Sequence, residues 1–347
     1  MSVIPDHYAV DNLHGLVNDL VNCDDVGSLN ARAGDDRYRQ AVADAARTLA
    51  SQAFTDHDED AARRAHATLA VLYDWYFSPP SVDGSESLLQ VIADDIRRVL
   101  ENVMLDDIYG RMDLSSLSGV PEDHESFLPW YRHFISIHQA SNHSFYRDFL
   151  ENRATPEDFR FYLAQETVLD PRFDDILAML IVGTVGPEKM ELGGNLWDEL
   201  GNGDPADVHP TVFAQTLRDA GVQQDFVSGN IMAESIASGN VSAALALSKR
   251  HYYKAIGYFG VTEYLTPRRF RSFVLGCKRL GLPEAAYRYH DMHIQVDARH
   301  GPSWFKNIVL PAIAREPRSA RDIAFGTLIR METSTWFLNA IQRVLDV

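Results

Sequence analysis

Residues 290–300 read HDMHIQVDARH, the densest run of metal-ligating residue types in the chain. Each residue of an α-helix advances by ~100°, so a helix here would place His293, Asp297 and His300 within ~60° of one another. Imidazole and carboxylate together suit iron, manganese or zinc. His290 lies near the same stripe, and helical geometry alone leaves His290 and His300 as alternatives for the third ligand. The alternative interpretation of the whole stripe is a solvated polar face.

The chain outside this stretch also has a helical pattern. Apolar residues recur at intervals of three and four in segments such as 42–54, 61–76 and 88–103, which is typical of amphipathic helices. Alternating β-branched stretches bounded by turn residues are nearly absent, so very little sheet is expected. The sequence therefore predicts an all-α protein.

A segment rich in serine, glycine and proline at residues 114–123 divides the chain. We predict an N-terminal helical region over residues 1–121 and a longer helical domain over residues 122–347. The longer domain is expected to open with a helix over 125–150. A second helix over 156–181 is expected to start after Thr155 as N-cap and to kink or break at Pro171. The helix that carries the metal-ligand stripe is expected to end at Gly301-Pro302.

Composition narrows the possible partners and the compartment. Of the 347 residues, 49 are acidic and 32 are basic, a formal net charge of −17, so nucleic acids and anionic membranes are poor partners. No apolar run is long enough to cross a bilayer. The first residues lack the features of a secretory signal, which predicts a cytoplasmic protein. Cys23 and Cys277 are too few for a disulfide framework or a cysteine-based zinc site.

One helix cannot enclose a metal, so further ligands must come from facing helices. Glu166 lies mid-helix among mostly apolar residues, where an inward-pointing carboxylate must be paired, protonated or metal-bound; the alternative is that it faces water. Glu199 and His209 flank the loop 201–205, and each taken alone is better explained by a surface position.

Glu263 is a further candidate, here for binding substrate. It follows an apolar stretch with Gly257 and Gly260, small residues that permit close helix packing, and it could receive a cationic or amine-bearing substrate. The ordinary alternative is a salt bridge with Arg268 or Arg269. A ferritin-like diiron fold is disfavoured, because no glutamate has a histidine three residues after it.

The candidate ligands, in chain order, resemble the ligand set of the haem-oxygenase-like diiron oxidases, and of their N-oxygenating branch in particular. The six positions are Glu166, Glu199, His209, His293, Asp297 and His300. The resemblance implies a haem-oxygenase-like helical bundle and two Fe(II) ions. It implies that Glu166, His209 and His300 serve one iron, and that Glu199, His293 and Asp297 serve the other. It also excludes His290 and implies an N-terminal helical region that mediates dimerisation.

The resemblance implies an enzyme of specialised metabolism that uses O₂ to oxidise the amino nitrogen of a small amine, amidine or aminoazole. The product would be a hydroxylamine, nitroso or nitro compound. Electrons would come from an external reductase or ferredoxin, and the protein would be a homodimer. One alternative is a diiron oxidase that cleaves C–C or C–H bonds of a fatty or amino acid. Another is a metal-free, thiaminase-like helical scaffold or binding protein.

Overall fold

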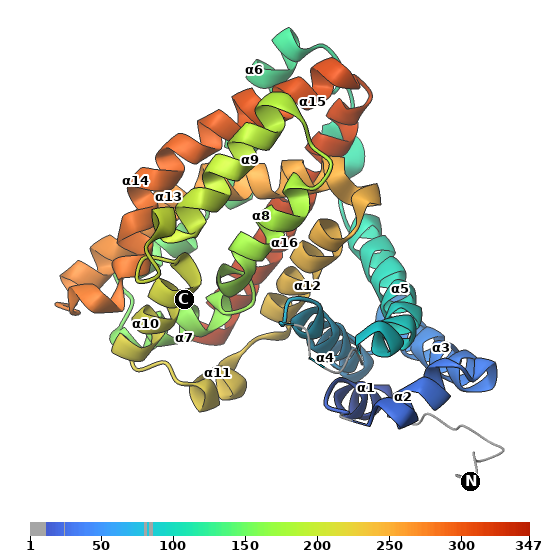
Figure 1. The fold of residues 1–347 in the computed structure, drawn as a ribbon. Helices are drawn as coiled ribbons and strands as arrows, with labels where there is room; N and C mark the ends of the chain where they lie inside the picture. Colours follow the sequence, from blue (N-terminus) through green and yellow to red (C-terminus); the bar gives the residue numbers. More distant parts are fainter. Residues whose placement is uncertain (1–11, 24, 80–81, 83–85) are drawn as a thin grey trace. The chain divides into compact units, whose positions relative to one another are not determined.

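The computed structural model describes residues 12–23, 25–79, 82 and 86–347. Within these residues the regular secondary structure is helical and no strand occurs, which confirms the prediction of an all-α protein (Figure 1). The chain divides into two compact units between Arg111 and Met112. This division precedes the boundary expected after residue 121, because the short helical turn Leu114–Leu117 contacts a helix of the second unit.

The first unit is built from five helices among its described residues. They are α1 (Leu13–Val21), α2 (Val26–Ala33), α3 (Asp36–Ala50), α4 (Glu59–Tyr76) and α5 (Glu86–Gly110). The first four each follow an Asn or Asp, of which Asp58 is an example, whose side chain accepts a hydrogen bond from the first helical turn. Their apolar faces bury Val17, Val42, Leu69 and Ile92 in a common core.

The second unit holds the remaining helices and all the residues singled out above as ligands. Its helices are α6 (His124–Ile137), α7 (Pro156–Glu166), α8 (Phe173–Ile181), α9 (Gly186–Glu199), α10 (His209–Asp219), α11 (Gln224–Asn230), α12 (Ala233–Leu247), α13 (Tyr252–Arg279), α14 (Arg288–Trp304), α15 (Leu310–Arg315) and α16 (Ser319–Leu345). The long helix α13 packs against both α14 and α16, and α14 also contacts α9 and α10.

Glycines allow α13 to approach its neighbours closely. A Cβ atom at Gly257 would lie 2.0 Å from the carbonyl oxygen of Ile323 in α16, and one at Gly301 would lie 2.7 Å from Cα of Tyr264. Any side chain at these positions would push the helices apart. The close packing of α13 on α14 fixes the two helices that carry most of the candidate ligands.

The predicted start of α7 is confirmed. Thr155 accepts a hydrogen bond from the Asp158 backbone, and the Asp158 carboxylate accepts one from the Thr155 backbone, a capping box with Pro156 in the first turn. The helix ends at Glu166, and the chain passes through a 3₁₀ turn at Asp170–Arg172 before α8. The break expected near Pro171 is therefore present.

Two predicted boundaries are wrong. The helix expected over 125–150 ends at Ile137 and is followed by a 3₁₀ turn and the π-helical segment Phe145–Leu150. The helix expected to end at Gly301-Pro302 continues to Trp304 and into the π-helical turn Phe305–Val309. Pro302 therefore lies inside α14, and the π-helical turn begins three residues after it.

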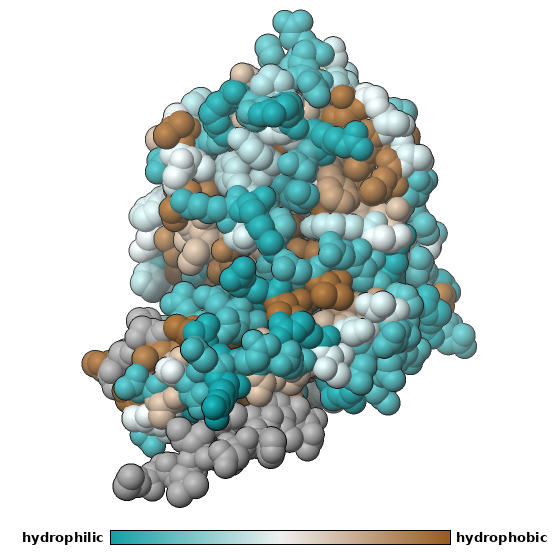
Figure 2. All heavy atoms as spheres, turned by 90° about the vertical axis from the view of Figure 1, so that its right-hand side faces the viewer, coloured by the Kyte–Doolittle hydropathy of each residue, from teal (hydrophilic) through white to brown (hydrophobic). Residues whose placement is uncertain are grey.

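The face drawn in Figure 2 is largely hydrophilic, with smaller hydrophobic areas between the polar side chains. In the described part of the chain, no helix combines the length and the apolar character needed to cross a bilayer.

Candidate metal centre

A tight loop places Glu199 and His209 side by side. α9 ends at Glu199 and α10 begins at His209. Between them Gly201 has a φ of 62°, and a Cβ atom there would lie 2.5 Å from the carbonyl carbon of Asp207. Glycine is the residue that fits such a turn. The turn reverses the chain, so that the start of α10 lies beside the end of α9.

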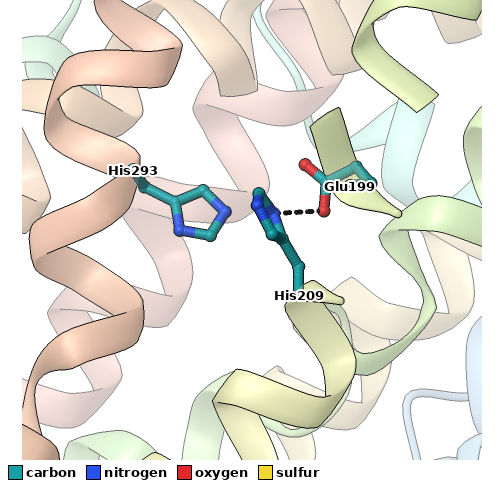
Figure 3. A group of neighbouring side chains, drawn as sticks. All are labelled: Glu199, His209 and His293. Atoms are coloured by element: carbon teal, nitrogen blue, oxygen red, sulfur yellow. Dashed lines mark ion pairs between the residues drawn. The ribbon is translucent and has the colours of Figure 1, made fainter. Parts of the chain in front are cut away.

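Glu199, His209 and His293 form the first triad, in which one ligand atom of each residue lies within 4.8 Å of the other two. Figure 3 shows the three side chains pointing toward one another from the ends of α9 and α10 and from the middle of α14. His209 Nδ1 lies 2.6 Å from Glu199 Oε2. The imidazole rings of His209 and His293 are 4.3 Å apart between centroids. All three residues are buried.

Glu263, Asp297 and His300 form the second triad, which meets the same 4.8 Å criterion and is also buried. Asp297 and His300 lie one turn apart on α14, and Glu263 comes from the facing helix α13. His300 Nδ1 is 3.5 Å from Glu263 Oε2 and 3.6 Å from Asp297 Oδ1. The two triads share α14.

Two histidines are oriented by hydrogen bonds outside the triads. His293 donates from Nδ1 to the carbonyl oxygen of Tyr289, at 2.6 Å. His300 donates from Nε2 to the Asp198 carboxylate, at 2.9 Å. Such bonds fix the tautomer and leave the other ring nitrogen free to bind a metal. That nitrogen is Nε2 in His293 and Nδ1 in His300, and the latter faces Glu263 and Asp297.

Burial sets the electrostatics of the carboxylates. Burial, followed by the charge of Glu263, raises the pKa of Glu199 and of Asp297 well above the ordinary range. A carboxylate in this environment prefers to be neutral unless a cation balances it. The acidic groups therefore create a site at which a bound cation has a large stabilising effect.

The histidines respond to burial in different ways. Burial lowers the pKa of His209 to about 4. Burial and the neighbouring His209 lower the pKa of His293 well below its usual value. Burial also acts to lower the pKa of His300, but the carboxylates of Asp297 and Glu263 outweigh it and raise the pKa to about 11. His209 and His293 are thus neutral, as metal ligands must be. The proton on His300 supplies the positive charge beside Asp297 and Glu263 that a bound metal would otherwise supply.

Two buried polar atoms of the second triad, Oε2 of Glu263 and Nδ1 of His300, form no hydrogen bond in the structure. In the first triad, Nδ1 of His209 is close to Glu199 Oε2 but without hydrogen-bond geometry. Unpartnered buried atoms of this kind cost free energy unless something binds them. Together the triads offer three carboxylates and three imidazoles, a donor set that suits iron, manganese or zinc. The residues present therefore fit a resident metal.

A small cavity of about 30 Å³ adjoins both triads. Glu199 and His293 of the first triad line it, as do Glu263 and Asp297 of the second. The rest of its wall includes Leu169, Phe173 and Phe270, together with the polar side chains Asp170, Thr262, Thr266 and Tyr289.

The structure brings five of the six residues named from the resemblance into the triads and leaves Glu166 outside them. Glu166 Oε2 lies 2.8 Å from Nε2 of the buried His290, in a separate pair. The grouping also differs from the division implied by the resemblance, because Glu263 takes its place beside Asp297 and His300. Sequence reasoning named Glu263 only for substrate binding. Glu263 is an acidic residue within an apolar helical segment, and this is the same sequence signal that singled out Glu166 as a candidate ligand.

The fold and the triads define an all-helical protein with a buried cluster of carboxylates and imidazoles that could hold a metal. The chain belongs to the family of iron-containing redox enzymes, whose model matches residues 160–335. That range contains both triads. Membership of the family indicates an iron-dependent oxidoreductase. No curated protein matches the chain.

Proposed function

We propose that the chain is a nonhaem diiron oxygenase whose two irons are held by the two triads. The observation that carries the proposal is the presence of two buried carboxylate–imidazole triads on one shared helix, α14. When bound, two Fe(II) ions would activate O₂ and transfer one of its oxygen atoms.

The protein's own residues have separate tasks in this proposal. The carboxylates of Glu199, Glu263 and Asp297 offset most of the charge of two divalent ions. The Tyr289 carbonyl and the Asp198 carboxylate hold His293 and His300 in their binding orientations. The apolar side chains of Leu169, Phe173 and Phe270 form part of the wall of the small cavity beside these ligands.

We further propose that the substrate is a small molecule with an oxidisable amino nitrogen. The first step is then R–NH₂ + O₂ + 2 e⁻ + 2 H⁺ → R–NHOH + H₂O. One oxygen atom forms the new N–O bond and the other leaves as water. The two electrons come from an external reductase or ferredoxin, and repeated cycles would give the nitroso or nitro compound.

Anaerobic titration with Fe(II) tests the metal centre. We expect two equivalents per chain for the native protein and a lower stoichiometry for Glu263→Gln. Glu284→Gln, at an exposed glutamate, is the matched control and should still bind two. Absence of iron uptake would instead support the metal-free scaffold.

The reaction is tested by adding O₂ and a chemical reductant to the loaded protein with a panel of amines, amino acids and fatty acids. Mass spectrometry should detect the gain of one oxygen atom on nitrogen. Loss of a carbon fragment, or formation of an alkene, would replace N-oxygenation with the oxidative cleavage of C–C or C–H bonds.

A further inference from the structure

A cavity of about 190 Å³ lies in the second unit, and no triad residue lines it. It is bounded by α7, α13, the end of α10 and the turn Glu284–Ala286. We call it the outer cavity. Protein interiors hold few voids larger than a water molecule. A void of this size is therefore a candidate binding site, and the side chains around it indicate which kind of molecule would fill it.

The inner end of the outer cavity is apolar and buried. Leu163, Phe273 and Cys277 line it, and each of them is 1% exposed. Cys277 and Ala286 are small side chains, and they leave the space between the helices unfilled. Apolar cavities of this kind stay free of water and take up apolar atoms or molecules.

The two charged side chains in the wall already have partners. Arg160 forms an ion pair with Glu157, and Asp219 accepts a hydrogen bond from Gln215 at 2.8 Å. Asp219 and Pro283 are exposed, so this side of the cavity reaches the surface of the unit. An ionic ligand would bury its charge beside apolar side chains without gaining a partner, which is costly. The occupant expected here is small, neutral and apolar.

An aromatic layer, made of Phe273, His290 and Phe270, lies between the outer cavity and the triads. Phe273 lines the outer cavity and stacks on His290, with 3.8 Å between the ring centroids. His290 meets Phe270 at 4.6 Å, and Phe270 lies 5.7 Å from the ring of His293 in the first triad. Phe270 also lines the small cavity beside the triads. A small neutral molecule can cross such a layer as its side chains move, whereas a charged molecule would lose its hydration there.

We propose that the outer cavity takes up dioxygen from solvent and passes it across the aromatic layer to the triads. Among the reactants of the proposed function, O₂ is the one that is small, neutral and apolar, whereas a protonated amine would enter at a high cost in desolvation. The inference deepens the proposed function and rests on it for the use of O₂. Uptake of a small apolar molecule by the cavity requires only the side chains around it.

Xenon is the probe for uptake, since this apolar atom binds in empty apolar cavities. A crystal of the iron-free chain under xenon pressure should show a xenon peak bounded by Leu163, Phe273 and Cys277. Ala286→Leu, which fills the cavity, should lose this peak, and Ala285→Leu, at the exposed neighbouring position, should retain it. Absence of xenon from the outer cavity of the native chain, or ordered water in its place, would overturn the proposal.

The rate at which O₂ oxidises the bound iron tests delivery. The chain is loaded anaerobically with Fe(II), mixed with limiting O₂ and followed by stopped-flow absorbance. Ala286→Leu should react ~10-fold more slowly than the native chain. Cys277→Met fills the same cavity from α13 and should also slow the reaction, whereas Ala285→Leu should not.

The two measurements separate the possible failures. Native oxidation rates in both filled variants, each without the xenon peak, would overturn the proposal. Failure of the native chain to load iron, with xenon still bound in the outer cavity, would overturn the proposed function alone.

Discussion

At the scale of single residues, the candidate metal site is marked by buried ligand atoms that would lack a hydrogen-bond partner if no metal were bound. His300 is a clear case, since its Nδ1 faces two carboxylates while its Nε2 is held by Asp198. The regular period of a helix allowed the stripe of His293, Asp297 and His300 to be recognised from sequence. The choice between Glu166 and Glu263 could not be made in this way, because both lie in apolar helical runs and their directions depend on tertiary packing.

Asp198→Asn tests the role of the bond to His300. The amide keeps the size of the side chain but loses the charge that fixes the imidazole, so we expect a ~10- to 100-fold loss of affinity for the iron at the second triad. Isothermal titration with Fe(II) under anaerobic conditions measures it. Asp219→Asn, at an exposed position, is the control, and equal affinities in the two variants would show that the bond has no such role.

The environment of His251 leads us to expect that the free energy of unfolding depends on pH. Arg250 donates from Nε to Nε2 of His251 at 3.0 Å, so the ring is neutral in the folded chain. Burial and the charges of Arg250 and Lys254 lower its pKa to about 4 from 6.5. Between these values the unfolded chain binds a proton that the folded chain does not, so the free energy of unfolding should fall as the pH falls from 6.5 to 4.

Chemical denaturation of His251→Gln at several pH values measures this contribution. Its free energy of unfolding should fall less steeply than that of the native protein, by at most about 1.4 kcal/mol per pH unit. His133→Gln, at an exposed histidine, should behave as the native protein does. Identical slopes for His251→Gln and the native protein would contradict the argument.

At the scale of helices, close packing through glycine decides how α13, α14 and α16 meet. The sequence indicated close approach at Gly257, and a Cβ atom there would indeed strike the backbone of α16. The sequence did not indicate that α14 continues past Pro302 to Trp304, because a glycine followed by a proline is by itself a signal for the end of a helix. The sequence signal at the start of α7, the N-cap Thr155, predicted the observed helix boundary because its hydrogen bonds lie within one turn of the helix.

Gly326→Ala tests the packing of α13 on α16. Its Cβ atom would lie 1.8 Å from the carbonyl oxygen of Lys254, so the backbones must separate, and we expect a loss of ~1–3 kcal/mol in stability. Gly194→Ala, at an exposed position of α9 with no atom within 4 Å of the added Cβ, should be neutral or stabilising by ~0.5–1 kcal/mol. Thermal unfolding compares the two, and equal midpoints would contradict the packing argument.

At the scale of the whole molecule, the family match covers part of the second unit and none of the first. The role of the first unit as a dimerisation region remains a prediction. We expect light scattering of the full chain to give about twice the 39.0 kDa of one copy. A mass of one copy across the micromolar range would contradict it.

The central claim is that the two triads hold two irons. A crystal grown anaerobically with Fe(II) tests it most directly, through the anomalous scattering of iron. The account predicts two peaks in each chain, one among Glu199, His209 and His293 and the other among Glu263, Asp297 and His300. No peak at either triad, or iron bound at Glu166 and His290 instead, would contradict it.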